Sequence, residues 1–284
     1  MSKQTISERA ARYAMKFDQS IRVSDVILSD DNKAKVQKIL QELKHRDLFK
    51  AYPEQGLYAM NKFLFYGASG CGKTYLAQAL SNTIGYDMLC VDIARALANG
   101  NVATNIQEIF EVGNCGDCVI FLDEVDSVAW DRDASKAEDG DMRRAINGLF
   151  QQIDRMNPDT ILIAATNMLH RLDVAFKRRF DLIMEFTNPK GNLLDSARHF
   201  ITPPFELIDR RDALDELEEY KLLKVSGSYD AIRGMCKRAM KAAVLRGNLK
   251  LTVSDIYAEA VYDKKSNLEL ADVKVVSVSD LQGG

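Results

Sequence analysis

The chain has 284 residues, and its 46% hydrophobic and 28% charged content is ordinary for a globular protein with a full core. The formal net charge of -3 provides no long-range attraction to nucleic acid or to an anionic membrane surface. The composition therefore disfavours nucleic-acid and membrane partners, and the length favours one large domain with a smaller one.

Membrane insertion and disulfide bonding are not expected either. No run approaches the ~18 apolar residues of a membrane helix, and residues 1–5 lack the apolar core of a secretory signal. The five cysteines are scattered along the chain and form no disulfide framework, which fits a reducing compartment. Cys115 and Cys118 have the spacing of a redox pair or of half a zinc site, but no second pair or histidine cluster accompanies them. We therefore expect a cytoplasmic protein.

Short apolar runs alternate with helical patterns in the first two thirds of the chain. Residues 1–23 are polar and are predicted to form an N-terminal arm, and the spacing of Val36, Ile39 and Leu43 then predicts a helix. Strands are predicted at 63–66, 88–91, 119–122, 161–165 and 182–186, with helices at 73–84, 105–112, 141–156 and 173–179. Several strands lack a polar face, as strands buried on both sides do. The predicted fold class is α/β, a doubly wound parallel five-stranded sheet.

Beyond Pro189 the pattern becomes helical, with helices expected at 193–200, 213–220, 229–245 and 254–261. This change predicts a domain boundary. We expect a large α/β domain over 24–188, a small all-helical domain over 189–264 and a C-terminal tail over 265–284. The tail has weak alternation and a glycine end, which favours an edge strand or disorder.

A phosphate-binding loop is predicted between the first strand and the helix that follows it. Residues 67–74, Gly-Ala-Ser-Gly-Cys-Gly-Lys-Thr, match the P-loop pattern, in which glycines let backbone N–H groups surround phosphates. We expect Lys73 on the β and γ phosphates of ATP and the Thr74 hydroxyl on Mg²⁺. A glycine-rich turn without a ligand is the alternative. The predicted nucleotide contacts here are Gly67, Ala68, Ser69, Gly70, Cys71, Gly72, Lys73, Thr74 and Tyr75.

Polar residues also follow the third and fourth predicted strands. Asp123 and Glu124 end the run 119–122, and Asn167 follows the run 161–165. Carboxyl ends of parallel strands share one edge, so Asp123 is expected to hold Mg²⁺ through water and Glu124 to polarise the attacking water. Asn167 would contact the γ phosphate or the water. The alternative for Asp123 and Glu124 is that these acids cap the next helix, and the alternative for Asn167 is a simple turn residue.

Two adjacent arginines, Arg178 and Arg179, end the helix predicted at 173–179. Basic residues at that position favour the helix dipole, which is one interpretation. In the other interpretation they reach the nucleotide of a neighbouring subunit.

In this order and spacing, the motifs resemble those of AAA+ ATPases, from Asp25 to about Ala260. The similarity is closest to the AAA subgroup proper, whose members include protease motors, microtubule-severing enzymes and complex disassemblers. The resemblance implies a P-loop domain followed by a helical lid, and Mg²⁺-dependent ATP hydrolysis in a homo-oligomer, a hexameric ring. It implies that Asn167 is the residue called sensor 1, and that Arg178 and Arg179 are arginine fingers acting in trans.

Two further segments are assigned by the resemblance alone. Residues 25–28 resemble the segment that wraps the adenine, and residues 226–230 resemble the start of the lid helix, where small residues contact the nucleotide. The contacts implied are Val26, Ile27, Gly227 and Ser228.

The chain departs from the family in its pore residues. Members that thread polypeptide carry an aromatic and a glycine in a loop whose counterpart here, residues 97–100, keeps only the glycine. Trp130 lies in a stretch that corresponds to a second pore loop, and it is either a substrate contact or an aromatic half-buried against its own helix. The sequence contains no His-Glu-x-x-His zinc site, so we expect any protease partner to be separately encoded.

Three functions are compatible with these motifs. The first is remodelling, unfolding or disassembly of a protein, with a protein substrate or adaptor as partner. The second is a nucleic-acid-linked ATPase such as a loader or transposition regulator, which the acidic balance disfavours. The third is a scaffold that binds ATP as a switch. Such a scaffold does not need the acids and arginines that the chain carries, so their presence argues against this function.

Overall fold

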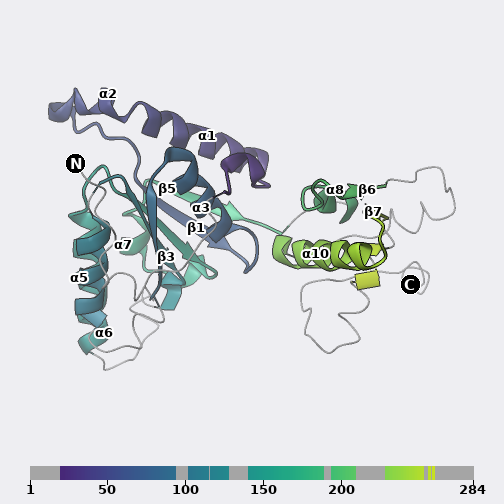
Figure 1. The fold of residues 1–284 in the computed structure, drawn as a ribbon. Coiled ribbons are helices and arrows are strands. Elements are labelled where there is room, and N and C mark those ends of the chain that lie inside the picture. Colours follow the sequence, from purple (N-terminus) through teal and green to yellow (C-terminus); the bar gives the residue numbers. More distant parts are fainter. Residues whose placement is uncertain are drawn as a thin grey trace, which may run out of the picture. The chain divides into compact units, whose positions relative to one another are not determined.

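The computed structural model describes residues 20–93, 102–114, 116–127, 140–188, 193–208, 228–252, 255–256 and 258–259 (Figure 1). By their internal contacts the residues fall into two compact units. The first comprises Met1–Gly67 and Lys73–Phe186, and the second comprises Ala68–Gly72 and Thr187–Gly284.

The first unit contains the predicted parallel sheet. Its strands are β1 (Lys62–Gly67), β2 (Asp87–Asp92), β3 (Cys118–Asp123), β4 (Ile161–Thr166) and β5 (Leu182–Phe186). Their order is β2-β3-β4-β1-β5 and all neighbours are parallel, which confirms the α/β fold class. The inner strands β3 and β4 are apolar and buried on both sides, and in β4 every residue is buried.

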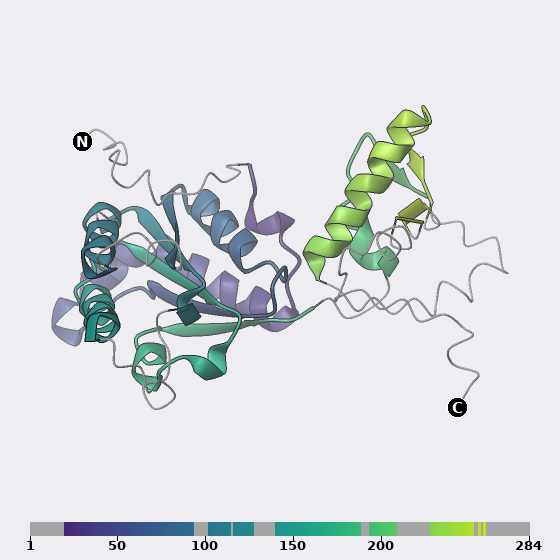
Figure 2. The same ribbon diagram turned by 90° about the horizontal axis from the view of Figure 1, so that it is seen from below.

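Helices cover both faces of this sheet. They are α1 (Asp30–Lys44), α2 (Arg46–Lys50), α3 (Lys73–Ile84), α5 (Val102–Gly113), α6 (Gly140–Asp154) and α7 (Val174–Lys177). Side chains of α5, α6 and α7 pack with alternate residues of the strands in one core cluster, and α5 lies beside α6 (Figure 2). The side chains that α3 buries do not belong to that cluster. Helix α3 instead contacts strands β1 to β4 on the other face of the sheet.

The observed helix ends differ from the predicted ones by small amounts. Helix α3 has the predicted bounds, whereas α7 is four residues long and ends at Lys177, so that Arg178 is its C-cap. Helix α2 was not predicted, because five residues are too few to show a helical period. Ser29 caps α1, since its hydroxyl accepts the Asn32 N–H at 3.3 Å.

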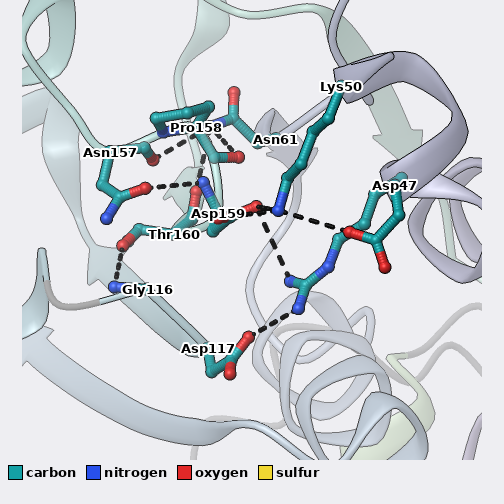
Figure 3. A network of polar contacts seen from close by, with 10 residues as sticks. Asp47, Lys50, Asn61, Gly116, Asp117, Asn157, Pro158, Asp159 and Thr160 are labelled. Carbon is teal, nitrogen blue, oxygen red and sulfur yellow. Dashed lines mark hydrogen bonds and ion pairs between the residues drawn. The ribbon is translucent and has the colours of Figure 1, made fainter.

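A polar network joins α2 to the loops that precede the strands (Figure 3). The Lys50 ammonium lies 2.9 Å from Asp159, and this hydrogen bond raises the pKa of Lys50. Arg46 pairs with Asp117 at 2.8 Å, and the Asn61 amide donates to backbone carbonyls of the loop before β4. These contacts lie at the amino ends of β1, β3 and β4. They are therefore at the edge of the sheet opposite the predicted phosphate site.

The second unit is built around α10 (Tyr229–Leu245), with α8 (Leu193–Arg198) beside it. The apolar residues of α10 form a core with residues of α8 and of the chain after α10. A parallel pair of two-residue strands, β6 (Glu206–Leu207) and β7 (Lys250–Leu251), was absent from the all-helical prediction, because two residues leave no period to detect. The helix expected at 213–220 and the tail at 265–284 lie outside the described residues.

Within the described part of the chain, no helix has the length and apolarity that crossing a membrane requires.

Candidate active site

Of the predicted catalytic residues, Glu124 and Asn167 lie at the carboxyl edge of the sheet in the first unit. Strand β1 ends at Gly67, β3 at Asp123 and β4 at Thr166, and the register places Tyr66 opposite Thr166. Because the strands are parallel, the residues that follow them share this edge. The structure thus brings together side chains that are separated by about a hundred residues in the sequence.

Lys73 is the first residue of α3 and only 7% of it is exposed. Its ammonium donates to the Gly67 carbonyl oxygen at 2.7 Å and to Asn167 Oδ1 at 2.8 Å. A buried cation needs such partners, because its desolvation without them costs several kcal/mol or more. The ammonium at the start of α3 is therefore held by two neutral oxygens that an anionic phosphate can replace.

Thr74 and Asp123 present a hydroxyl and a carboxylate to the same point. Thr74 Oγ1 donates to Asp123 Oδ2 at 3.4 Å, and the other carboxylate oxygen accepts the Glu124 N–H at 3.0 Å. Mg²⁺ prefers oxygen ligands and keeps several waters, so one hydroxyl with one carboxylate is a donor set that fits it. Magnesium is the metal expected at this position.

Glu124 is exposed and its backbone has φ +54°, in the left-handed region. This conformation costs roughly 1 kcal/mol or more in a residue other than glycine, and it persists only where the surroundings enforce it. Here the N–H bond to Asp123 and the buried Val125 behind it fix the turn. The residue is exposed, so a water can reach its carboxylate.

Asp126 is a site residue whose contact was not predicted. Its Oδ1 accepts the Thr166 hydroxyl at 2.7 Å and the Asn167 N–H at 3.4 Å. The carboxylate thereby links the segment after β3 to the end of β4 and orients Asn167. A third acid three residues after Asp123 was the only sequence signal, and it is indistinguishable from an exposed turn residue.

Two glycines of the P-loop cannot be replaced without strain. Gly67 has φ +144°, and a Cβ there would lie 1.9 Å from the Phe186 carbonyl oxygen. Gly70, which belongs to the second unit, has φ +74°, and a Cβ would lie 2.7 Å from Ser228 Oγ. Ser228 caps α10 by accepting the Ala231 N–H at 3.3 Å, so within this unit the loop contacts the start of that helix.

Arg178 and Arg179 have different environments. Arg179 donates twice to Asp154, at 2.9 Å each, and once to the Ala175 carbonyl oxygen at 2.7 Å. Its guanidinium also lies 4.3 Å from the centre of the Phe150 ring. Arg178 is exposed and makes no side-chain hydrogen bond or ion pair with any described residue. The sequence could not separate the two arginines, because both follow the same short helix.

For the other predicted nucleotide contacts, the structure gives the element and the burial of some residues and does not describe the rest. Val26 and Ile27 are half-buried and follow a 3-10 turn, η2 (Val23–Asp25), that packs on α3. Tyr75 is half-buried in α3. Gly227, Trp130 and residues 97–100 lie outside the described residues.

The chain is similar in sequence to known ATPases. Residues 63–188 match the family described as "ATPase family associated with various cellular activities (AAA)". The chain is 32% identical over 242 residues to an uncharacterized AAA family ATPase of Sinorhizobium fredii, covering 84% of this chain and 70% of that protein. It is 29% identical over 258 residues to a putative 26S proteasome regulatory subunit homolog of Methanothermobacter marburgensis, covering 88% of this chain and 63% of that protein.

A third relative is the ATP-dependent zinc metalloprotease FtsH 1 of Alkaliphilus metalliredigens, 31% identical over 186 residues, with 62% of this chain and 31% of that protein covered. The chain thus spans only part of the length of each of these relatives.

Proposed function

Because the chain belongs to the AAA family of ATPases, we propose that it hydrolyses ATP with Mg²⁺ as one subunit of a hexameric ring, and that hydrolysis drives the remodelling, unfolding or disassembly of a protein. One observation carries the enzymatic part of this proposal. At a single sheet edge, a buried ammonium is held by a carbonyl and an amide oxygen, beside a hydroxyl and carboxylate that suit Mg²⁺.

Five residues of the chain have distinct proposed roles in hydrolysis. Lys73 exchanges the Gly67 and Asn167 oxygens for the β and γ phosphates, and Asn167 is then released to contact the γ phosphate or the attacking water. Glu124 orients that water and accepts its proton. Thr74 and Asp123 would hold Mg²⁺, which neutralises charge that develops on the phosphates when it is bound.

One of the two arginines completes the site from a neighbouring subunit. We assign the role of arginine finger to Arg178, which is exposed and makes no polar side-chain contact with the described residues of its own chain. Arg179 has its guanidinium engaged by Asp154, which supports a role in holding the end of α7 against α6. An arginine supplied in trans makes hydrolysis depend on assembly.

A protein, and not nucleic acid, is the proposed substrate. Relatives named as a proteasome regulatory subunit homolog and as an ATP-dependent protease support this class, and so does the formal net charge of -3. An adaptor or a separately encoded protease is the further partner proposed. Residues 97–100 lack the aromatic of threading members, so we propose that this chain grips its substrate by other residues.

The test is to trap the assembly with Glu124→Gln in ATP, which keeps nucleotide bound and slows hydrolysis. Light scattering after gel filtration should give the mass of a ring, and mass spectrometry should identify a protein that co-purifies. Lys73→Ala is the matched control, because without bound nucleotide it should not retain that protein. If the trapped protein stays monomeric, or if DNA and not protein stimulates the wild-type ATPase, the ring or the substrate assignment is wrong.

A further inference from the structure

The apex of the P-loop has one side chain by which the rest of the protein can hold it. Cys71 stands between Gly70 and Gly72, neither of which has a side chain. It is 3% exposed, and its Sγ–H donates to Asn188 Oδ1 at 2.9 Å. Asn188 is an exposed residue just beyond the end of β5, and both residues belong to the second unit. No motif in the sequence singled out this asparagine.

The start of α10 encloses the same apex within this unit. The Asp230 N–H donates to the Gly70 carbonyl oxygen at 3.2 Å. Burial raises the pKa of Tyr229, the first residue of α10, and the nearby Cys71 contributes to this shift. Thus the loop, the segment after β5 and the helix start converge on the Cys71 side chain.

This anchoring matters because a P-loop binds phosphates through its backbone. Its N–H groups attract phosphate oxygens only while the loop keeps one conformation, and glycines on both sides of Cys71 make that conformation costly in entropy. A loop that is already held in this conformation before the ligand arrives loses less conformational entropy during binding. The contact that holds it should therefore affect nucleotide affinity more than the chemical step.

We propose that Asn188 is a positioning residue for ATP binding, which holds the phosphate-binding loop in its binding conformation by accepting a hydrogen bond from the Cys71 thiol. It acts through Cys71 and does not itself touch the reacting atoms. Asn188 is exposed, so its replacement leaves the buried core of either unit intact.

Equilibrium binding of a fluorescent ATP analogue and steady-state kinetics test this role. Asn188→Leu keeps the side-chain size and removes the acceptor, and it should raise the Kd and the KM about fivefold, as expected for one neutral hydrogen bond, with kcat unchanged. Cys71→Ala should do the same, whereas Cys71→Ser, which keeps a donor, should retain most of the affinity. The double variant Asn188→Leu with Cys71→Ala should be no weaker than either single variant, because both remove the same bond.

Thr187→Ala, a change at the neighbouring exposed residue, is the matched control and should leave the KM as in the wild type. The inference is wrong if the two single effects multiply in the double variant, if Cys71→Ser is as weak as Cys71→Ala, or if kcat falls while the KM stays constant.

A second readout needs no nucleotide, so it separates failure of this inference from failure of the proposed function. In the nucleotide-free protein, alkylation of Cys71, followed by peptide mass spectrometry, should be several-fold faster in Asn188→Leu than in the wild type or in Thr187→Ala. Cys236, which is fully buried, serves as the internal reference for global unfolding. Equal alkylation of Cys71 in all three proteins would refute the contact.

Discussion

Replacing each of the two arginines by alanine should separate a stabilising contact from a catalytic one. Arg179 is 25% exposed, and its side chain makes a bidentate pair with Asp154, a bond to the Ala175 carbonyl oxygen and a stack on Phe150. A partly exposed pair is worth at most about 1 kcal/mol, the cation–π contact about 0.5–1 and the neutral acceptor about 1. Arg179→Ala should therefore lower the free energy of unfolding by about 1–3 kcal/mol, whereas Arg178→Ala should change it by less than about 0.5.

The assay combines thermal unfolding with ATPase turnover. In a chain of this size about 1 kcal/mol shifts the Tm by roughly 2–4 °C, so Arg179→Ala should melt several degrees below the wild type. Arg178→Ala should melt with the wild type, bind the fluorescent ATP analogue normally and lose about a thousandfold in turnover. Arg155→Ala, a change of another exposed arginine at the end of α6, is the control for both measurements.

Mixing decides whether the arginine acts in trans. Arg178→Ala combined with Lys73→Ala should regain part of the activity, because a subunit with an intact arginine then serves a neighbour with an intact P-loop. The reasoning is refuted if Arg178→Ala keeps its turnover, if Arg179→Ala loses turnover without any loss of stability, or if co-assembled mixtures never recover.

Three further predictions concern single residues. Glu124→Gln should bind ATP normally and hydrolyse it at least about a hundredfold more slowly in a phosphate-release assay, and a normal rate would assign the base elsewhere. Gly67→Ala should cost more than about 3 kcal/mol of stability in urea unfolding, because its Cβ would lie 1.9 Å from the Phe186 carbonyl oxygen, and a wild-type midpoint would contradict the strand packing. Burial raises the pKa of Cys236 to about 12, so this thiol is protonated below that pH in the folded chain. It should resist a thiolate-specific reagent at pH ~8 until urea unfolds the protein, and rapid labelling of the native state would disprove its burial.

Features that arise from neighbouring residues could be predicted from the sequence. The strands appear as short apolar runs, because a strand buried on both sides needs no polar alternation. The P-loop appears as glycines and a lysine at fixed spacing, since the phosphate-binding backbone is a local structure. Helix α10 has the predicted bounds, because its apolar residues recur with the helical period and Ser228 caps it. The parallel order of the strands then put Lys73, Asp123 and Asn167 at one edge.

Contacts between residues far apart in the chain were decided only by the tertiary structure. Arg179 and Asp154 are 25 positions apart, Thr166 and Asp126 are 40 apart, and Asn188 and Cys71 are 117 apart. Such pairs leave no periodicity or motif, because each depends on how strands and helices pack after they form. The sequence therefore identified the groups that we propose to act on ATP, whereas packing determined which acid orients Asn167, which arginine is engaged within the chain and which asparagine contacts the phosphate-binding loop.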